Sequence, residues 1–380
     1  NLKQRAITLV INPGNHLAPE ILFLRRRNAF AEQWNGRMYS VADASRISGI
    51  KEIWDASELG PFLRALKNKQ PYQPKPENIL MSAGTRDSGG RSGFESILEA
   101  AAKNEADLFL LAAGQPEGAE YRQEFRAAAD WATATGYRVK NASPIFAELR
   151  LRKSPMEVAL MQHAIDITNE ALQRAWVVAG NAKWEYEVDA EVIYTFKLRN
   201  ADHWGYPPIV GCGPNATVLH YIESQSPLKP GDLMLMDVGA EYEHYTADVT
   251  RTFPVNGKFS AAQAEIYQIV YDAQEAAGKA SRPGNTISDV NRAATEVIKD
   301  GLLRIGLITD RNSGQYRTWF MHGTSHWLGM NVHDVGNYGA KLEPGMVFTN
   351  EPGIYVRPDA LDYLPKTEEN TKFIAAIKPA

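Results

Sequence analysis

The sequence predicts two domains, a small α/β domain over residues 1–145 and a larger α+β domain over residues 146–380. The chain has 380 residues, and a single domain typically has roughly 100–200. Short apolar runs alternate with helical patterns in the first part of the chain, which is typical of an α/β domain. In the second part, long amphipathic helices separate strand-like stretches that lie between and after them.

The composition narrows the class of protein. Apolar residues make up 44% of the chain, as in an ordinary globular protein. The net charge of −4, from 41 basic and 45 acidic residues, gives no reason to expect nucleic acid or an anionic membrane as a partner. No apolar run approaches the roughly 20 residues of a membrane helix. Cys212 is the only cysteine and the start shows no signal-peptide pattern, so we expect a cytoplasmic protein.

The N-terminal region contains four stretches of strand length and one helical pattern. The expected strands are Ile7–Ile11, Ile21–Leu24, Asn78–Met81 and Leu108–Ala112, and the expected helix is Glu120–Gly136. The Gly-rich stretch Gly84–Gly93 lacks the Gly-Lys-Ser/Thr ending of a phosphate-binding loop. We therefore interpret it as a surface turn.

The second domain is expected to begin with a helix after Ser154. Ser154 and Glu157 fit a capping box, and Pro155 suits the first helical position. The apolar residues expected on one face of this helix are Val158, Met161, Ile165 and Leu172. Two later helices are expected, one capped by Ser260 and Gln263 and one over Ser288–Leu303.

Two aspartates are predicted to meet on a β-hairpin. Leu233–Met236 reads as a buried strand, the residues from Tyr245 onward alternate, and a turn within Gly239–His244 would pair them. Asp237 and Asp248 would then converge on one face. Neighbouring carboxylates repel each other unless a cation neutralises them. The pair therefore favours a metal site, although each aspartate alone also fits a turn cap or a solvated surface residue.

A glutamate lies at the end of a further strand-like stretch. Met346–Thr349 reads as a short strand, and Glu351 precedes a Pro-Gly turn. A side chain held by such a turn can point into a site. The alternative is an ordinary solvated loop glutamate.

Three of the eight histidines, His322, His326 and His333, lie in one Gly-rich stretch. The spacing of the first two resembles that of zinc-binding helices. The residues between them are poor helix formers and include no glutamate, which argues against that motif. On a strand these two side chains would share a face, and a bend would allow His333 to join them. Together with the carboxylates they supply donors that suit Mn, Co, Zn or Fe.

The order and spacing of these motifs resemble the pita-bread metallopeptidases. The stretches "YPPIVGCGPNATVLHY", "MDVGAEYEHYTADVTRTFP", "HGTSHWLGMNVHDVG" and "LEPGMVFTNEPGIY" carry the resemblance. Residues 145–356 are most similar to bacterial Xaa-Pro aminopeptidases (aminopeptidase P), with prolidases next. The first part resembles the creatinase-type N-terminal domain. The resemblance implies a C-terminal pita-bread fold preceded by that small α/β domain.

The resemblance also implies a role for each residue. Asp237, Asp248, His326 and Glu351 correspond to metal ligands, and Asp248 to the ligand shared by two metals. The expected substrate-binding residues are His220 near the scissile bond, His322 at the proline pocket, and His333 at the scissile carbonyl or the tetrahedral intermediate. Glu351, His333 and His220 are the expected catalytic residues.

The implied activity is metal-dependent hydrolysis of the N-terminal Xaa-Pro bond of peptides by a water activated between two metals. The implied cofactors are two divalent metal ions, with Mn²⁺ expected first and Co²⁺ or Zn²⁺ as alternatives. The implied partner is a proline-containing peptide. A homodimer or homotetramer is expected. The alternatives are a prolidase restricted to Xaa-Pro dipeptides and a metal-free binding or chaperone relative.

One motif of the family is not found. Its second glutamate ligand lies in a C-terminal "G-x-R-x-E-D" strand, whereas this sequence ends in "LPKTEENTKFIAAIKPA". Glu368 and Glu369 lie in a charged, helix-like run and are not assigned as ligands, so the fifth ligand is unidentified. We expect the functional protein to continue beyond Ala380 with a strand that brings a glutamate to Asp248. The start of the chain also resembles an incomplete domain.

Overall fold

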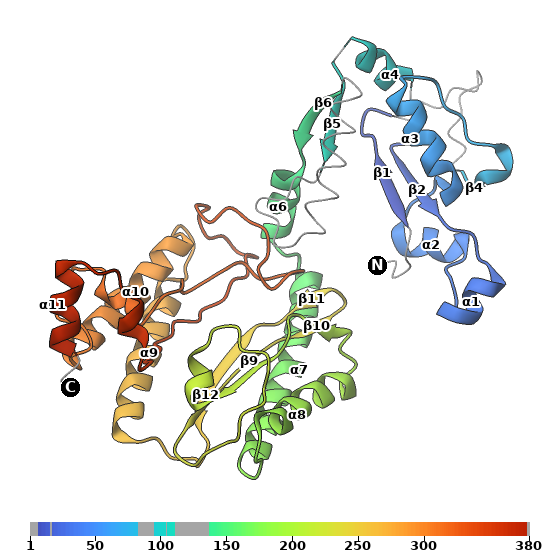
Figure 1. Cartoon of the computed structure of the whole chain (residues 1–380). Coiled ribbons are helices and arrows are strands. Elements are labelled where there is room, and N and C mark those ends of the chain that lie inside the picture. Colours follow the sequence, from blue (N-terminus) through green and yellow to red (C-terminus); the bar gives the residue numbers. More distant parts are fainter. Residues whose placement is uncertain (1–6, 16, 83–94, 104, 111–136, 378–380) are drawn as a thin grey trace. The chain divides into compact units, whose positions relative to one another are not determined.

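The computed structural model describes residues 7–15, 17–82, 95–103, 105–110 and 137–377. Contacts divide the chain into two compact units, Asn1–Ser143 and Pro144–Ala380. We describe each unit by itself (Figure 1). Among the described residues, no helix is both long enough and apolar enough to cross a membrane.

The N-terminal unit is built on a four-stranded sheet in the order β1-β2-β3-β4. The β2–β3 pair is parallel, and the β1–β2 and β3–β4 pairs are antiparallel. The strands are β1 (Thr8–Ile11), β2 (Glu20–Leu24), β3 (Ile53–Asp55) and β4 (Ile79–Met81). The helices are α1 (Ala29–Asn35), α2 (Val41–Ser48), α3 (Leu59–Lys67) and α4 (Glu95–Ala102). Strands β5 (Asp107–Leu110) and β6 (Arg138–Asn141) form a separate parallel pair.

The four strands expected in this unit are confirmed, with bounds that differ by one residue, and Leu111 and Ala112 at the end of the fourth lie outside the described residues. The sequence reasoning missed β3, because three consecutive buried residues show neither alternation nor strand length. It also missed β6 and the helices α1, α2, α3 and α4. The expected helix Glu120–Gly136 and the expected turn Gly84–Gly93 lie outside the described residues.

The C-terminal unit consists of long helices and two small antiparallel sheets. The sheets have the orders β12-β9-β8 and β11-β10-β7. Their strands are β7 (His203–Trp204), β8 (Ile209–Cys212), β9 (Leu233–Val238), β10 (Ala240–Tyr242), β11 (Tyr245–Thr246) and β12 (Val249–Pro254). The helices are α6 (Ser143–Leu151), α7 (Pro155–Ala179), α8 (Glu185–Leu198), α9 (Ala261–Ala280), α10 (Ile287–Arg304) and α11 (Glu368–Ile377).

The capping signals of the sequence define the helix starts. Ser154 with Glu157 and Ser260 with Gln263 both form complete capping boxes, as predicted. Helix α10 begins one residue earlier than predicted, because Thr286 and not a later residue caps it. The predicted face of α7 is partly wrong. Met161 and Leu172 are buried, but Val158 is 41% exposed, and four of the eight buried residues of α7 are alanines.

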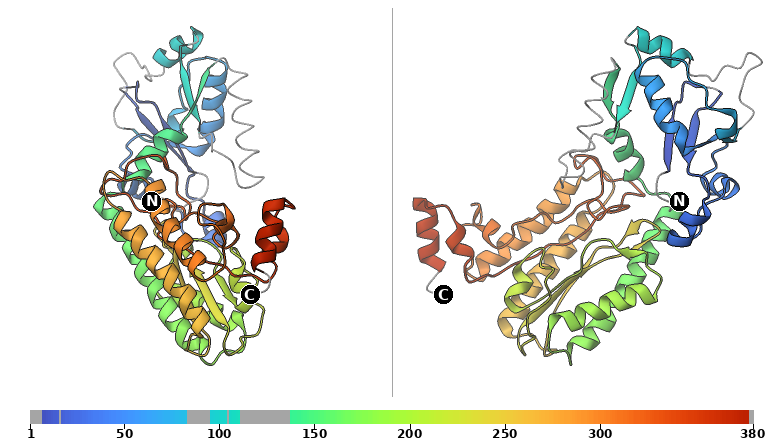
Figure 2. Two further views of the ribbon diagram at one scale, coloured as in Figure 1. Left: turned by 90° about the vertical axis from the view of Figure 1, so that its left-hand side faces the viewer. Right: turned by 45° about the vertical axis from the view of Figure 1, so that its right-hand side comes forward.

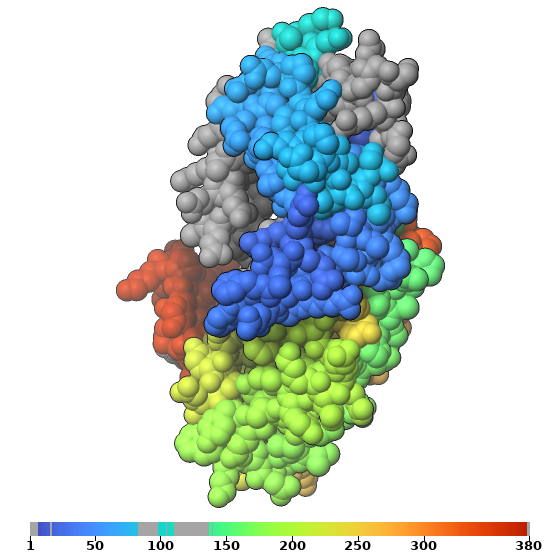
Figure 3. Space-filling view, turned by 90° about the vertical axis from the view of Figure 1, so that its right-hand side faces the viewer, coloured from blue at the N-terminus to red at the C-terminus, as the bar shows by residue number. Residues whose placement is uncertain are grey.

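The two larger hydrophobic clusters among the described residues support the C-terminal unit. In one core, α7 and α8 pack against the apolar side chains of β8 and β9, including Met234, Met236 and Val238. In the other, α9 and α10 lie side by side and pack around Trp327 and the loops near it (Figure 2). On the face drawn in Figure 3, residues of α8 and of the segment that follows it lie next to one another at the surface (yellow-green).

Candidate metal centre

The predicted β-hairpin exists and carries both aspartates. Strands β9 and β12 pair antiparallel, with Asp237 opposite Thr250 and Val238 opposite Val249. Asp248 directly precedes β12. The hairpin is longer than predicted, because β10 and β11 continue it to a tight turn at Glu243 and His244, whose φ angles are 48° and 70°.

Gly239 allows the chain to bend between the two strand pairs. A Cβ atom at this position would collide with the backbone oxygen of Ala247. Glycine is therefore required by the close approach of the two backbones. This bend lies between Asp237 and Asp248 in the hairpin, so it helps to set how their side chains converge.

A tyrosine that the sequence reasoning did not single out links the two aspartates. The hydroxyl of Tyr206 donates a hydrogen bond to Oδ1 of Asp237 and lies 3.0 Å from Oδ1 of Asp248. Burial and the two neighbouring carboxylates raise the pKa of Tyr206 well above its usual value, so the phenol keeps its proton. Tyr206 lies in the recognised "YPPIV" stretch, but no local pattern indicates its partners.

The environment of Asp237 disfavours its charge. Burial, and then repulsion from Asp248, raise the pKa of Asp237 to about 7. The hydrogen bond from Tyr206 opposes this shift but does not cancel it. Without a cation, this side chain therefore holds a proton up to near neutral pH.

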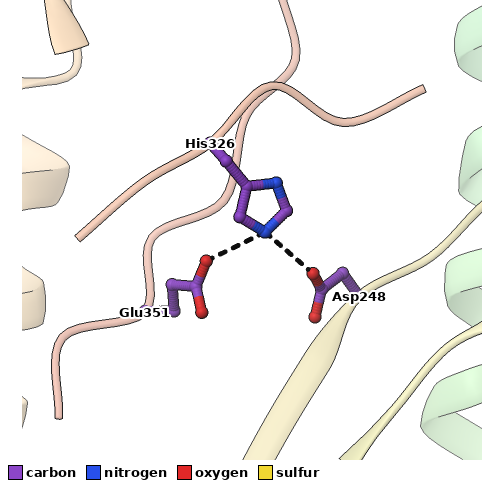
Figure 4. A group of neighbouring side chains, drawn as sticks. All are labelled: Asp248, His326 and Glu351. Atoms are coloured by element: carbon purple, nitrogen blue, oxygen red, sulfur yellow. Dashed lines mark ion pairs between the residues drawn. The ribbon is translucent and has the colours of Figure 1, made fainter. Parts of the chain in front are cut away.

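His326 lies between two carboxylates. Its Nε2 atom is 3.1 Å from Oδ2 of Asp248 and 3.0 Å from Oε1 of Glu351 (Figure 4). Its Nδ1 atom lies 3.0 Å from the backbone oxygen of Trp327, which directs Nε2 at the carboxylates. Burial lowers the pKa of His326, but the hydrogen bonds to the two carboxylates outweigh burial and raise it to about 10.

These three residues fit a cation. Ligand atoms of Asp248, His326 and Glu351 all lie within 4.8 Å of one another. One imidazole and two carboxylates are donors that suit divalent transition metals. A bound cation would neutralise the carboxylates and accept the lone pair of Nε2, replacing the proton that Nε2 otherwise carries.

Backbone hydrogen bonds hold His326 and Glu351 side by side. The amide of Thr349 donates to the oxygen of His326 at 2.9 Å, and the amide of Glu351 donates to the oxygen of Thr324 at 2.9 Å. The Thr349 hydroxyl donates to Oε1 of Glu351 at 2.7 Å and accepts from the amide of His326 at 2.9 Å. The backbone amide and the hydroxyl of Thr324 both donate to Oδ1 of Asn291 in α10, at 2.9 and 3.0 Å.

The strands expected around these ligands are not regular strands. The prediction of a strand over Met346–Thr349 and of strand geometry for His322–His326 is wrong. In this part of the described chain, the β-pairing consists of the isolated bridges Arg152↔Met346 and Trp327↔Phe348. The amide of His326 donates to the hydroxyl of Thr349 and not to a backbone oxygen, so a side-chain hydrogen bond interrupts the backbone ladder.

The other two histidines of the stretch lie outside the cluster of three ligands. His322 faces Tyr355, with 2.9 Å between Nε2 and the hydroxyl, and its ring also contacts the ring of Phe320. His333 is exposed, and its ring centroid lies 4.4 Å from that of His326. His220 is exposed on the segment after the short helix Gly213–Thr217.

A buried ion pair, also missed by the sequence reasoning, holds the loop of His333. The carboxylate of Asp334 is fully buried and pairs with Arg150 and, at 3.4 Å, with Lys153, whose side chain is 2% exposed. The absence of a Cβ atom at Gly329 leaves room for this carboxylate. Asp334, the residue next to His333, is therefore bound to the part of the chain where α6 ends and α7 begins. Neither sequence spacing nor periodicity indicates this contact across the unit.

The chain belongs to metallopeptidase family M24, which residues 159–373 match. Residues 2–73 match the aminopeptidase P N-terminal domain. These matches confirm the resemblance, the two-part fold, and the expectation of a hydrolase that uses divalent metal ions. Glu368 and Glu369 begin the exposed end of α11, as expected of a helical run.

Similar proteins cover most of the chain. The Xaa-Pro aminopeptidase of Escherichia coli K12 is 35% identical over 368 residues, which is 93% of this chain and 76% of that protein. The Xaa-Pro aminopeptidase of Haemophilus influenzae is 36% identical over 350 residues, 90% of this chain and 71% of that protein. The structure of Pseudomonas aeruginosa aminopeptidase PepP has a TM-score of 0.73 at 29% identity, covering 94% of this chain and 76% of that one. A putative aminopeptidase P from Bacillus anthracis has a TM-score of 0.74 at 28% identity, covering 94% and 82%.

The shifted pKa values predict how metal-free protein responds to pH. The folded state raises the pKa of Asp237 from 3.8 to about 7 and that of His326 from 6.5 to about 10. Each group thus stabilises the fold fully below its unfolded pKa, and this stabilisation is lost as the pH rises through its folded pKa. We expect the melting temperature of metal-free protein to fall from pH 6.5 towards pH 10, and stabilisation by added metal to grow over that range.

Thermal denaturation of metal-free and metal-loaded protein over this pH range is the measurement. The His326→Gln variant is the matched control and should show a flatter dependence. A melting temperature of metal-free protein that rises with pH, or does not change, would contradict the account.

Proposed function

We propose that this chain is an Xaa-Pro aminopeptidase, a metal-dependent exopeptidase that hydrolyses the N-terminal Xaa-Pro bond of peptides. The observation that carries the proposal is the cluster of Asp248, His326 and Glu351 in a chain of metallopeptidase family M24. The names of the relatives in Escherichia coli and Haemophilus influenzae support this substrate class. A metal-free binding protein would have no need of such a cluster, whose charges are costly without a cation.

Asp237, Asp248, His326 and Glu351 would hold two divalent cations, with Asp248 shared between them. When bound, the cations would supply Lewis acidity, which lowers the pKa of a water molecule and polarises the scissile carbonyl. Tyr206 keeps Asp237 and Asp248 in a common orientation through its hydroxyl. The hydroxyl of Thr349 orients Glu351, to which it donates, and the backbone of His326, from which it accepts.

Glu351 is the residue proposed to move the proton. Its Oε1 atom accepts from Thr349 at 2.7 Å. The side chain is 30% exposed, so substrate and water can reach it. We assign to Glu351 the removal of a proton from the attacking water and its delivery to the proline nitrogen that leaves.

His333 and His220 are proposed to contact the substrate. The ring of His333 is exposed beside His326, at 4.4 Å between centroids, so its N–H can reach a carbonyl oxygen at the metal centre. A donor aimed at the developing oxyanion stabilises the tetrahedral intermediate. The exposed His220 is proposed to act near the scissile bond.

His322 is proposed to line the proline pocket. Its ring contacts Phe320 edge-on at 5.1 Å and Tyr355 at 5.4 Å, which makes an aromatic wall. The amide nitrogen of an Xaa-Pro bond has no N–H to recognise. A pocket for this substrate must therefore recognise the shape of the proline ring, and aromatic side chains provide such a surface.

Three finer features belong to the same proposal. Mn²⁺ is proposed as the native metal, since carboxylate and imidazole donors suit it, with Co²⁺ or Zn²⁺ as alternatives. A homodimer or homotetramer is proposed. The exposed ring pair Phe30 and Trp34 on α1, 70% and 75% exposed, supports assembly because such apolar rings are commonly covered. The cytoplasm is the proposed compartment.

A peptide panel tests the function. Metal-loaded protein should release the first residue of Xaa-Pro-Xaa tripeptides and of longer Xaa-Pro peptides. The Asp248→Asn variant should lose this activity while remaining folded, whereas Asp272→Asn, a change at an exposed aspartate of α9, should not. Cleavage of Gly-Pro dipeptide alone would indicate a prolidase. Absence of both hydrolysis and metal binding would indicate a binding protein.

The division of roles among the histidines gives a second prediction. His333→Ala should lower kcat by about 10²–10³, the usual effect of removing one oxyanion donor, with little change in bound metal. His203→Ala, at an exposed histidine of β7, is the control. Turnover and metal content are measured on the same samples. Loss of metal in proportion to kcat would make His333 a ligand and would contradict the assignment.

A further inference from the structure

A further buried carboxylate, besides that of Asp334, lies outside the metal centre. Glu185, the first residue of α8, is fully buried, with 0% exposure. A carboxylate without a cationic partner is costly to bury unless hydrogen bonds satisfy it. Its contacts therefore show what the residue holds in place.

The groups that contact the Glu185 carboxylate are hydrogen-bond donors. Oε1 accepts from the amide of Cys212 at 2.7 Å and from Nδ2 of Asn215 at 3.1 Å. Oε2 accepts from the hydroxyl of Tyr221 at 2.7 Å and from the amide of Ser226 at 2.9 Å. A carboxylate offers only acceptors to these groups, and the N-terminus of a helix favours its negative charge.

These donors lie at both ends and in the middle of one segment, residues 212–226. Cys212 ends β8, which pairs with β9 so that Ile209 lies opposite the metal-centre residue Asp237. At the other end, the amide of Glu185 donates to the oxygen of Ser226 at 3.0 Å. The segment therefore begins at the sheet of the metal centre, and the Glu185 carboxylate binds both its first residue, Cys212, and its last residue, Ser226.

His220 lies on this segment, next to Tyr221. The side chain of His220 is exposed, whereas the hydroxyl of its neighbour Tyr221 is bound to Glu185. We propose that Glu185 is a positioning residue for the reaction: it fixes residues 212–226 to the sheet of the metal centre and so presents His220 to the peptide substrate. This inference rests on the proposed function of His220.

The Glu185→Gln variant tests the inference. Its amide N–H₂ would face groups that are themselves donors, so the segment should loosen without loss of side-chain volume. We expect kcat/KM for an Xaa-Pro-Xaa peptide to fall about tenfold or more, with bound metal unchanged. Glu187→Gln is the matched control, because Glu187 lies in the same helical turn and accepts from the amide of Lys183 at 2.7 Å. It should leave kcat/KM unchanged.

Combination with His220→Ala separates positioning from a general structural role. If Glu185 acts through His220, the double variant should be no slower than His220→Ala alone. The inference would be overturned if the fold-loss of kcat/KM in the double variant equalled the product of the losses in the two single variants. An unchanged kcat/KM in Glu185→Gln or in His220→Ala would also overturn it. Tyr221→Phe removes one of the donors and should show a smaller loss with the same non-additivity, which keeps the test available if Glu185→Gln does not fold.

Hydrogen exchange distinguishes this inference from the proposed function. Amides of residues 213–226 should exchange faster in Glu185→Gln than in Glu187→Gln, whatever peptide the enzyme cleaves. Faster exchange with no hydrolysis of any Xaa-Pro peptide by the unsubstituted protein would reject the proposed function, and with it the role of His220. Equal exchange in the two variants would reject the positioning role of Glu185 even if the peptides are hydrolysed.

Discussion

Carboxylates that lie close together repel one another, and this chain directs Asp248 and Glu351 at a single imidazole with Asp237 close by. The distances of 3.1 and 3.0 Å from His326 Nε2 leave room for one positive charge between the two carboxylates. A proton can supply that charge, as the pKa of about 10 for His326 indicates. A divalent cation supplies more charge and can bind all of the donors together. The need for a positive charge among these carboxylates is therefore the constraint on which the arrangement of the surrounding residues depends.

The framework holds the ligands from separate parts of the C-terminal unit. The bend at Gly239 and the hydroxyl of Tyr206 set the two aspartates, while backbone hydrogen bonds between residues 324–326 and 349–351 set His326 and Glu351. Buried charges hold the supporting loops. Asp334 with Lys153 fixes the loop of His333, and Glu185 joins the ends of residues 212–226. These polar contacts are buried, so a change in one partner leaves the other unsatisfied.

The sequence predicts the elements whose signals are local. Alternation and spacing locate the hairpin of Asp237 and Asp248, and Ser154–Glu157 locates the start of α7. The irregular segments around His326 and Glu351 were predicted as strands, because short apolar runs do not show where the backbone hydrogen bonds go. Tyr206 and Glu185 were missed for a different reason. Their partners lie more than twenty residues away along the chain, and the periodicity of a sequence does not predict contacts between side chains so far apart in the chain.

Anomalous diffraction from crystals soaked in Mn²⁺ tests the central claim most directly. We expect strong peaks at about 2.0–2.2 Å from carboxylate oxygens of Asp248 and Glu351 and from Nε2 of His326, with Asp237 on the same metal pair. Binding of a metal should also replace the proton on His326 Nε2, so that no hydrogen bond remains between this atom and the two carboxylates. Crystals that show no peak at these residues, or show the metal bound elsewhere in the chain, would contradict the account.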